Sequence, residues 1–332
     1  MLVNYPEYYD RFRCIASNCP DSCCKEWTVD VDGAAAEFYR SLNGALGDRL
    51  REVLQDTEDG TIMEIENGRC PMWRLDGLCR IQAELGHDAL CKTCREFPRL
   101  RHDYGSFVEL GLELSCPEAA RLILTSPVNS FCTKQVDGGE DPDYDGECMQ
   151  ILLRSRNTVL QYVSETNHTV PNTLAVILLY GHGIQAALDG GEEEPFCAET
   201  LLAEAKQYAQ IGDLQSLLQF FSGLEILTGE WSEHLQNPAP ILKWSPELKQ
   251  MAAYMISRYW LQAVSDYDLI SRVKLIVTAG LTVAALGGDT IRTAQLFSKE
   301  IENNPENVET ILDGAYTSPA LTDTNLLSLL LK

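Results

Sequence analysis

The residues with the clearest chemical potential are cysteines near the start of the chain. Cys14, Cys19, Cys23 and Cys24 fall within eleven residues. Turn-forming residues separate them, so the backbone can curl and direct several sulfurs inward. Thiolates gathered at this density are typical of a metal centre. We therefore interpret this stretch as half of a metal-binding core.

Two further cysteines follow predicted turns. Cys70 comes after a predicted strand over 61–66 and the tight-turn pair Asn67-Gly68, and Cys79 follows a second Asp-Gly pair. Strand ends joined by turns hold thiolates rigidly, as the knuckles of metal sites do. The pattern therefore predicts that Cys70 and Cys79 are ligands.

Cys91 and Cys94 form a C-x-x-C pair. Such a pair could be a thioredoxin-like redox site, but no βαβ pattern surrounds it and many cysteines lie nearby, which favours ligation. Cys116 follows a predicted half-buried strand over 107–114, where Ser115 and Glu118 form a capping-box pattern. The positive end of the helix favours a thiolate, so we interpret Cys116 as a ligand rather than as a small buried residue.

The candidate metal ligands, with Cys91 as a ninth thiol, are Cys14, Cys19, Cys23, Cys24, Cys70, Cys79, Cys94 and Cys116. They can serve two four-thiolate sites, or one site with spare thiols. Adjacent side chains diverge in an extended chain, so one of Cys23 and Cys24 could serve a second site. Zinc sites more often have two C-x-x-C knuckles or added histidine. Thiolate density therefore favours an iron–sulfur cluster, with zinc as the alternative.

The distribution of cysteines also predicts the domain organisation. Nine of the twelve precede residue 117. We therefore expect a cysteine-rich metal-binding domain over 1–125, an acidic, turn-rich linker over 126–146 and an all-helical domain over 147–332. In the first domain, Asp32 can cap a helix over 33–54. The predicted fold class is α+β and mostly helical.

Apolar periodicity predicts a nearly continuous series of helices beyond the linker. They cover 147–165, 172–189, 197–210, 212–228, 246–265, 268–286, 289–303, 306–314 and 320–331. In the helix over 246–265, an aromatic and methionine stripe is formed by Met251, Tyr254, Met255, Tyr259 and Trp260. Such a stripe is either a packed helix face or a groove for a partner segment.

Composition limits the partners. A formal charge of −23 over 332 residues argues against nucleic acid and anionic membranes, which need basic protein surface, and favours a basic or lysine-bearing partner, although solubility alone would also explain it. We find no secretory signal and no apolar run of the roughly 20 residues that a membrane span needs. We therefore expect a cytoplasmic protein, in which clustered cysteines bind metal or do redox work rather than form disulfides.

Several ordered motifs in roughly the first 125 residues resemble the flagellin lysine-N-methylase family. They are the residues 5–10, the four-cysteine stretch with Trp27 behind it, 68–71, 78–79, 93–99 and 114–121. The resemblance implies a bacterial enzyme with a cysteine-rich iron- or zinc-chelating domain. It implies methyl transfer from S-adenosylmethionine to lysine ε-amines of flagellin or another lysine-bearing protein, with an iron–sulfur centre such as a 4Fe–4S cluster.

The methyl-donor site is not marked by a familiar motif. The chain lacks both a Gly-rich strand-to-helix turn and the three-cysteine signature of radical enzymes. We predict cofactor binding by Arg95 and Arg99, which could clamp a carboxylate or offset thiolate charge, although structural ion pairing is an equal alternative. Asp21, Glu26, Asp30 and Glu96 could receive a lysine ammonium and later its proton. The alternative functions are a non-catalytic iron–sulfur or zinc module that senses redox state or binds a partner.

Overall fold

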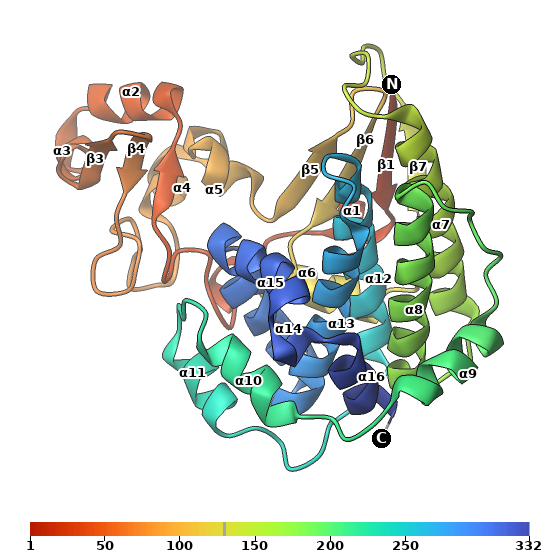
Figure 1. Ribbon diagram of the computed structural model, residues 1–332. Coiled ribbons are helices and arrows are strands. Elements are labelled where there is room, and N and C mark those ends of the chain that lie inside the picture. The colour runs from red at the N-terminus through yellow and green to blue at the C-terminus, as the bar shows by residue number, and fades with distance from the viewer. Residues whose placement is uncertain (129–130, 332) are drawn as a thin grey trace.

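The computed structural model describes residues 1–128 and 131–331. Its buried apolar side chains form two separate hydrophobic cores. The smaller core draws on residues 29–91, and we call residues 29–96 the small lobe. The larger core belongs to the rest of the chain, which we call the body. Figure 1 shows the small lobe projecting to one side of the body.

The body contains a four-stranded sheet in the order β5-β6-β1-β7. Strand β1 (Leu2–Pro6) runs parallel to β6 (Phe107–Leu112), and β5 (Arg99–Asp103) and β7 (Phe131–Gln135) are antiparallel edge strands. Parallel strands cannot be joined by a tight turn and need a long crossover. Here the crossover contains the small lobe, which is therefore an insertion between β1 and β5.

The small lobe is built on a three-stranded antiparallel sheet in the order β2-β4-β3. Its elements are β2 (Val29–Val31), α2 (Gly33–Ser41), α3 (Gly44–Val53), β3 (Leu54–Thr57), β4 (Gly60–Met63), α4 (Arg80–Leu85), the 3₁₀ helix η2 (His87–Ala89) and α5 (Lys92–Glu96). The helix predicted over 33–54 is two helices, because the backbone is extended at 42–43 and Gly44 has a φ of 81°. Asp32 caps α2 as predicted, accepting from the Ala35 N–H at 3.1 Å.

Helices make up most of the body. They are α1 (Tyr8–Arg11), α6 (Pro117–Thr125), α7 (Gly146–Glu165), α8 (Val170–Leu188), α9 (Ala198–Tyr208), α10 (Leu214–Ser222), α11 (Gly229–Gln236), α12 (Glu247–Tyr259), α13 (Leu269–Leu286), α14 (Thr290–Phe297), α15 (Pro305–Thr317) and α16 (Asp323–Leu331). Shorter turns are the 3₁₀ helices η1 (Ala16–Asn18), η3 (Trp260–Val264) and η5 (Pro319–Leu321) and the π-helical turn η4 (Ser298–Glu302). The mixed, mostly helical fold class is confirmed, although the periodicity did not reveal α11.

Helix α13 is the centre of the body. It is long and apolar enough to span a membrane, with a mean hydropathy of 1.7, but all of it is buried inside the body. A helix that is apolar all round is typical of a large core. Its neighbour α8 approaches closely, because Gly181 of α8 lies against Val273 of α13.

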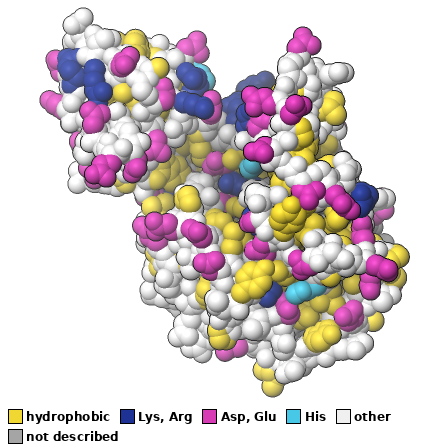
Figure 2. Space-filling view, turned by 45° about the horizontal axis from the view of Figure 1, so that its top comes forward, with side chains coloured by type: hydrophobic (Ala, Val, Ile, Leu, Met, Phe, Trp, Pro, Cys, Tyr) yellow, Lys and Arg dark blue, Asp and Glu magenta, His cyan; other side chains and the backbone are white. Residues whose placement is uncertain are grey.

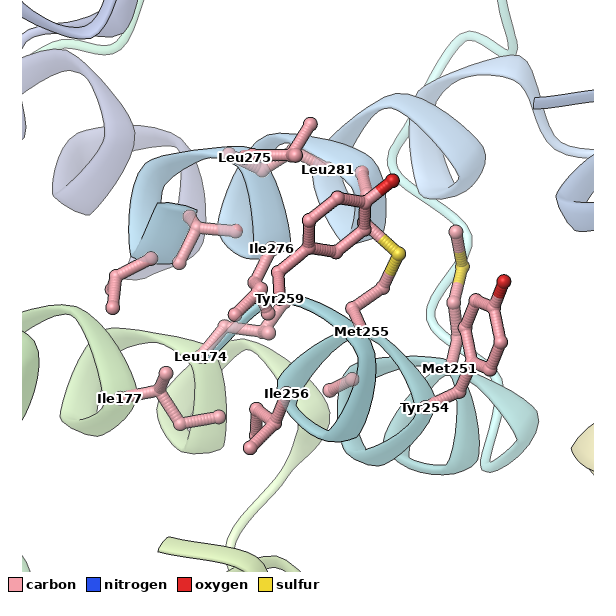
Figure 3. Packing of buried hydrophobic residues seen from close by; sticks show 14 of the residues in the cluster. Leu174, Ile177, Met251, Tyr254, Met255, Ile256, Tyr259, Leu275, Ile276 and Leu281 are labelled. Carbon is pink, nitrogen blue, oxygen red and sulfur yellow. The ribbon is translucent and has the colours of Figure 1, made fainter. Parts of the chain in front are cut away.

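The stripe on α12 is part of this core. Met251, Tyr254, Met255 and Tyr259 are all buried, and so is Trp260, which directly follows α12. Figure 3 shows their helix between α8, which contributes Leu174 and Ile177, and α13. The packed-face interpretation is therefore confirmed.

The two hydrophobic cores divide the chain at other positions than the domain boundaries predicted from the distribution of cysteines. Residues 107–124 pack in the body core together with the helices beyond residue 146, although they fall within the predicted domain 1–125. Strand β7 lies within the predicted linker 126–146. The predicted division thus describes where the cysteines lie and not where the cores lie.

A candidate metal centre at the junction of the two lobes

The stretch from Cys14 to Cys24, which we call the cysteine segment, carries the chain from the body to the small lobe. It folds through η1 and then a turn in which the Cys24 N–H donates to the Ser22 hydroxyl at 3.1 Å. The Cys24 carbonyl accepts from the Cys70 N–H at 2.8 Å. This contact places the end of the cysteine segment beside Cys70.

Cys70 and Cys79 are positioned by turns, as predicted. The Asn67-Gly68 turn has positive φ at both residues, 53° and 75°, and closes between Glu66 and Arg69. Cys79 lies at the N-terminus of α4, where its carbonyl accepts from the Ala83 N–H. Burial raises the pKa of both thiols, that of Cys70 to about 11, and each is further raised by neighbouring thiolates that include Cys91.

Cys91 and Cys94 are held at the start of α5 by Asp32. One oxygen of Asp32 caps α2, and the other accepts from the Lys92 N–H at 2.7 Å. A hydrogen bond from the Cys94 thiol lowers the pKa of Cys91 to about 7, and the reciprocal effect raises the pKa of Cys94. Cys91, which the sequence placed only ninth, is thus the better thiolate of the pair.

Cys116 begins α6 but does not have the predicted environment. No side chain caps this helix, and Ser115 instead donates to Glu113 at 3.2 Å, so the predicted capping box is wrong. Burial raises the pKa of the Cys116 thiol to about 12, although the N–H groups of Ala119 and Glu118 lower it. The expectation that the helix end favours a thiolate here was therefore wrong, because burial outweighs the backbone.

The nine N-terminal cysteines form one electrostatic neighbourhood. Thiolates of Cys19 and Cys23 raise the pKa of Cys116, and Cys14 and Cys23 raise that of Cys19, although burial is the main cause for both. In the same way, Cys24 and Cys70 contribute to the raised pKa of Cys94, and Cys23 contributes to that of Cys79. Pairwise electrostatic influence therefore links the nine thiols across four separate stretches of chain.

The thiols of the adjacent Cys23 and Cys24 lie closer together than they would in an extended chain, where neighbouring side chains point apart. A hydrogen bond between their side chains is the main cause that raises the pKa of Cys23. The positions of these two thiols alone therefore give no reason to divide them between two sites.

The donor set fits an iron–sulfur cluster in its chemistry, because it is made of thiols alone. All twelve cysteines of the described chain have free thiols. Within residues 1–128 and 131–331, no three Cys, His, Asp or Glu side chains stand close enough to hold an ion as they lie. Metal binding by the predicted ligands thus stays a prediction, and it requires the sulfurs to draw together.

The two arginines predicted to bind the cofactor lie on either side of residues 96–98, where the chain returns from the small lobe to the body. Arg95 lies on α5 of the small lobe and Arg99 on β5 of the body, and both are exposed. Arg99 also lies over the ring of Phe12, 5.3 Å from its centroid. Figure 2 shows a hollow between the two lobes with lysine and arginine side chains on both walls. Asp and Glu side chains lie beside them in the same view, and the roles of Arg95 and Arg99 stay predictions.

Two of the four predicted lysine-receiving acids, Asp21 and Glu26, are already paired. Lys299 of η4 contacts Asp21 at 3.2 Å and Glu26 at 2.5 Å. Both carboxylates therefore hold a lysine of this chain rather than facing an empty site. Sequence reasoning missed Lys299, which lies inside the helix predicted over 289–303.

Comparison with known proteins gives relatives but no fold match. Neither a protein-family model nor a solved structure matches the chain. It is 29% identical over 273 residues to a lysine-N-methylase of Salmonella typhimurium, covering 77% of this chain and 62% of that protein. A lysine-N-methylase of Salmonella choleraesuis is 28% identical over the same length. The flagellar biosynthetic protein FliU of Salmonella muenchen is 35% identical over 137 residues, 38% of this chain and 79% of FliU.

Proposed function

The chain belongs to the lysine-N-methylase family, and from this membership we propose that it is a protein lysine N-methyltransferase that uses S-adenosylmethionine. The name of its relative FliU supports flagellin, or another lysine-bearing flagellar protein, as the substrate. The chain spans 62% of the length of the lysine-N-methylases it matches. Its net charge of −23 favours a lysine-bearing partner. We place the reaction in the bacterial cytoplasm.

The proposed cofactor is an iron–sulfur cluster held at the junction of the two lobes, with zinc as the alternative metal. The electrostatic links among nine thiols from separate stretches of chain support this proposal. When bound, such a cluster would supply an iron position able to chelate the amino and carboxylate groups of a methyl donor. The ligands would come from Cys14, Cys19, Cys23, Cys24, Cys70, Cys79, Cys91, Cys94 and Cys116.

Two exposed arginines, Arg95 of α5 and Arg99 of β5, would act on the substrates. Arg95 and Arg99 would attract the anionic carboxylate of the methyl donor. A substrate lysine must lose its proton before it attacks a methyl group, and Asp21 and Glu26 are occupied by Lys299. Of the four predicted acids, the exposed Asp30 and Glu96 are therefore the candidates for the proton acceptor.

The test begins with anaerobic purification, metal analysis and an absorption spectrum, which distinguish iron from zinc. The iron-loaded protein is then incubated with S-adenosylmethionine and flagellin, and the product is weighed by mass spectrometry. We expect the mass of flagellin to rise by whole methyl groups. A protein that holds iron but never adds mass would instead be the non-catalytic module that the all-thiol donor set also supports.

A matched pair of cysteine variants makes this test specific. Cys70→Ser removes a buried junction thiol, whereas Cys197→Ser removes an exposed thiol at the start of α9. We expect Cys70→Ser to lose both iron and methyl transfer, and Cys197→Ser to keep both. Equal activity in the two variants would contradict a metal-dependent methylase at the junction.

A further inference from the structure

Lys299 connects the body to the cysteine segment. It lies in the π-helical turn η4, and only 2% of its side chain is exposed. Its ammonium contacts Asp21, which lies inside the cysteine segment, and Glu26, which follows it. The same ammonium lies 5.1 Å from the ring centroid of Trp27. One buried side chain thus makes three contacts with a single stretch of junction chain.

Gln295, near the end of α14, extends this connection to Cys116. Its Nε2 atom donates to Asp21 Oδ2 at 3.3 Å and to the Ser115 carbonyl at 2.6 Å. Only 1% of its surface is exposed. Because Asp21 lies between Cys19 and Cys23 and Ser115 precedes Cys116, the amide joins two stretches of chain that carry candidate ligands.

We propose that Lys299, with Gln295, is a positioning residue that holds Cys19 and Cys23 of the cysteine segment in register with Cys116. This inference deepens the proposed function and rests on its metal role for these thiols. The two carboxylates and the aromatic face compensate for the loss of hydration around the buried ammonium. Asp21 also contacts Arg292 of α14 at 3.2 Å. Without Lys299, Glu26 loses its ion-pair partner and Asp21 keeps Arg292, so the cysteine segment loses part of its attachment to residues 292–299.

The buried Lys274 provides a matched control. It lies on α13, is 7% exposed, and pairs with Asp323 at 3.2 Å and with the Ala315 carbonyl at 2.8 Å. Lys299→Met and Lys274→Met therefore remove the same kind of buried ion pair from different places. Lys299→Arg keeps the charge and serves as the conservative variant.

The first measurement needs no metal. Reduced, metal-free protein is alkylated, and the rate at each cysteine is followed by peptide mass spectrometry. For Lys299→Met we expect roughly tenfold faster alkylation of Cys19 and Cys116 with unchanged rates at Cys70 and Cys91, because a local anchor is lost. Lys274→Met should change none of these rates, and Lys299→Arg should restore the slower ones.

Two results would overturn the proposal. One is an unchanged rate at Cys19 and Cys116 in folded Lys299→Met, and the other is an equal increase at all four cysteines, which indicates general unfolding. If Lys299→Met does not fold, Glu26→Gln removes one of its two carboxylate partners and is measured in the same way. Unchanged rates at Cys19 in that folded variant would also contradict the proposal.

The second measurement reads the metal centre itself. After anaerobic loading with iron and sulfide, Lys299→Met should show roughly tenfold weaker iron binding and an altered absorption spectrum, while Lys274→Met matches the parent protein. If the parent protein takes up no iron, the metal role in the proposed function fails. The alkylation rates would still decide whether Lys299 positions the thiols.

Discussion

The body and the small lobe are stabilised in different ways. The body is organised around α13, whose residues are all buried, and its core extends over many helices. The small lobe has short elements and a small core in which Tyr39 and Leu50 are fully buried. Two members of that core, Cys70 and Cys91, are also candidate ligands. A unit this short buries too little apolar surface to be very stable by itself.

This difference indicates a division of labour. The body can fold around its own side chains and present a fixed surface, which includes Lys299 and Cys116. The cysteine segment supplies four more thiols, and the small lobe supplies Cys70, Cys79, Cys91 and Cys94. A bound metal would complete the core of the small lobe. The lobes should therefore respond differently to metal removal and to changes in their cores.

Metal removal should separate the two lobes most strongly. Structural metals can contribute on the order of 10 kcal/mol to the folding of small units. Removing the metal from loaded protein should greatly speed amide hydrogen exchange in residues 29–96, while α8 and α13 stay protected. Hydrogen exchange with mass spectrometry measures this directly. Equal changes in both lobes would show that they are not separate units.

Matched core variants should sharpen the comparison. Leu50 in the small lobe and Leu281 in the body are both fully buried. Each change to alanine should cost about 2–5 kcal/mol in free energy of unfolding. Leu50→Ala should speed exchange only in the small lobe and lower its metal content, whereas Leu281→Ala should lower the melting temperature of the body. A single shared transition, lowered by both variants, would contradict the two-core description.

The sequence predicted best those features that depend on neighbouring residues. The cap at Asp32 and the turn before Cys70 follow from local backbone chemistry, and both are confirmed. Cys116 shows the limit of such reasoning. Its position at a helix start was readable, but the burial that raises its pKa comes from distant chain.

Long-range pairing lay beyond the sequence. Asp21 and Lys299 are 278 positions apart, and no local pattern connects them. The same holds for the insertion of the small lobe into the body, which depends on the parallel pairing of β1 with β6. Such contacts depend on which elements pack together. The apolar periodicity of the sequence predicts the buried face of each helix or strand, but it does not say which other element that face contacts.

A smaller change tests how tightly the body is packed. A Cβ on Gly181 would lie 2.8 Å from a methyl carbon of Val273, whereas a Cβ on Gly183 in the same helix meets no atom within 4 Å. Gly181→Ala should therefore destabilise the body by about 1–3 kcal/mol through overpacking. Gly183→Ala should stabilise it slightly, because alanine favours helix. Thermal unfolding compares the two, and equal melting temperatures would mean that α8 and α13 can move apart freely.

The smallest expected effect is the pH response of the body at Glu300, next to Lys299. Burial raises the pKa of its carboxyl, although the Thr228 hydroxyl and the Leu227 N–H donate to it. A carboxyl whose pKa is higher in the folded state contributes stability that is fully present below its unfolded pKa, about 4.3. That stability is lost as the pH rises through the folded pKa. Glu300→Gln should therefore flatten the decline in melting temperature of the body as pH rises above this value.

Calorimetry of the variant at a series of pH values tests this effect against a matched control. Glu309 on α15 is exposed, so Glu309→Gln should leave the pH profile of the body unchanged. The unfolding of the small lobe should keep its own profile in both variants, because Glu300 packs only within the body. If Glu300→Gln and the parent protein decline with the same slope, burial does not govern the titration of this carboxyl. The body would then resemble the small lobe, with its charged groups effectively open to water.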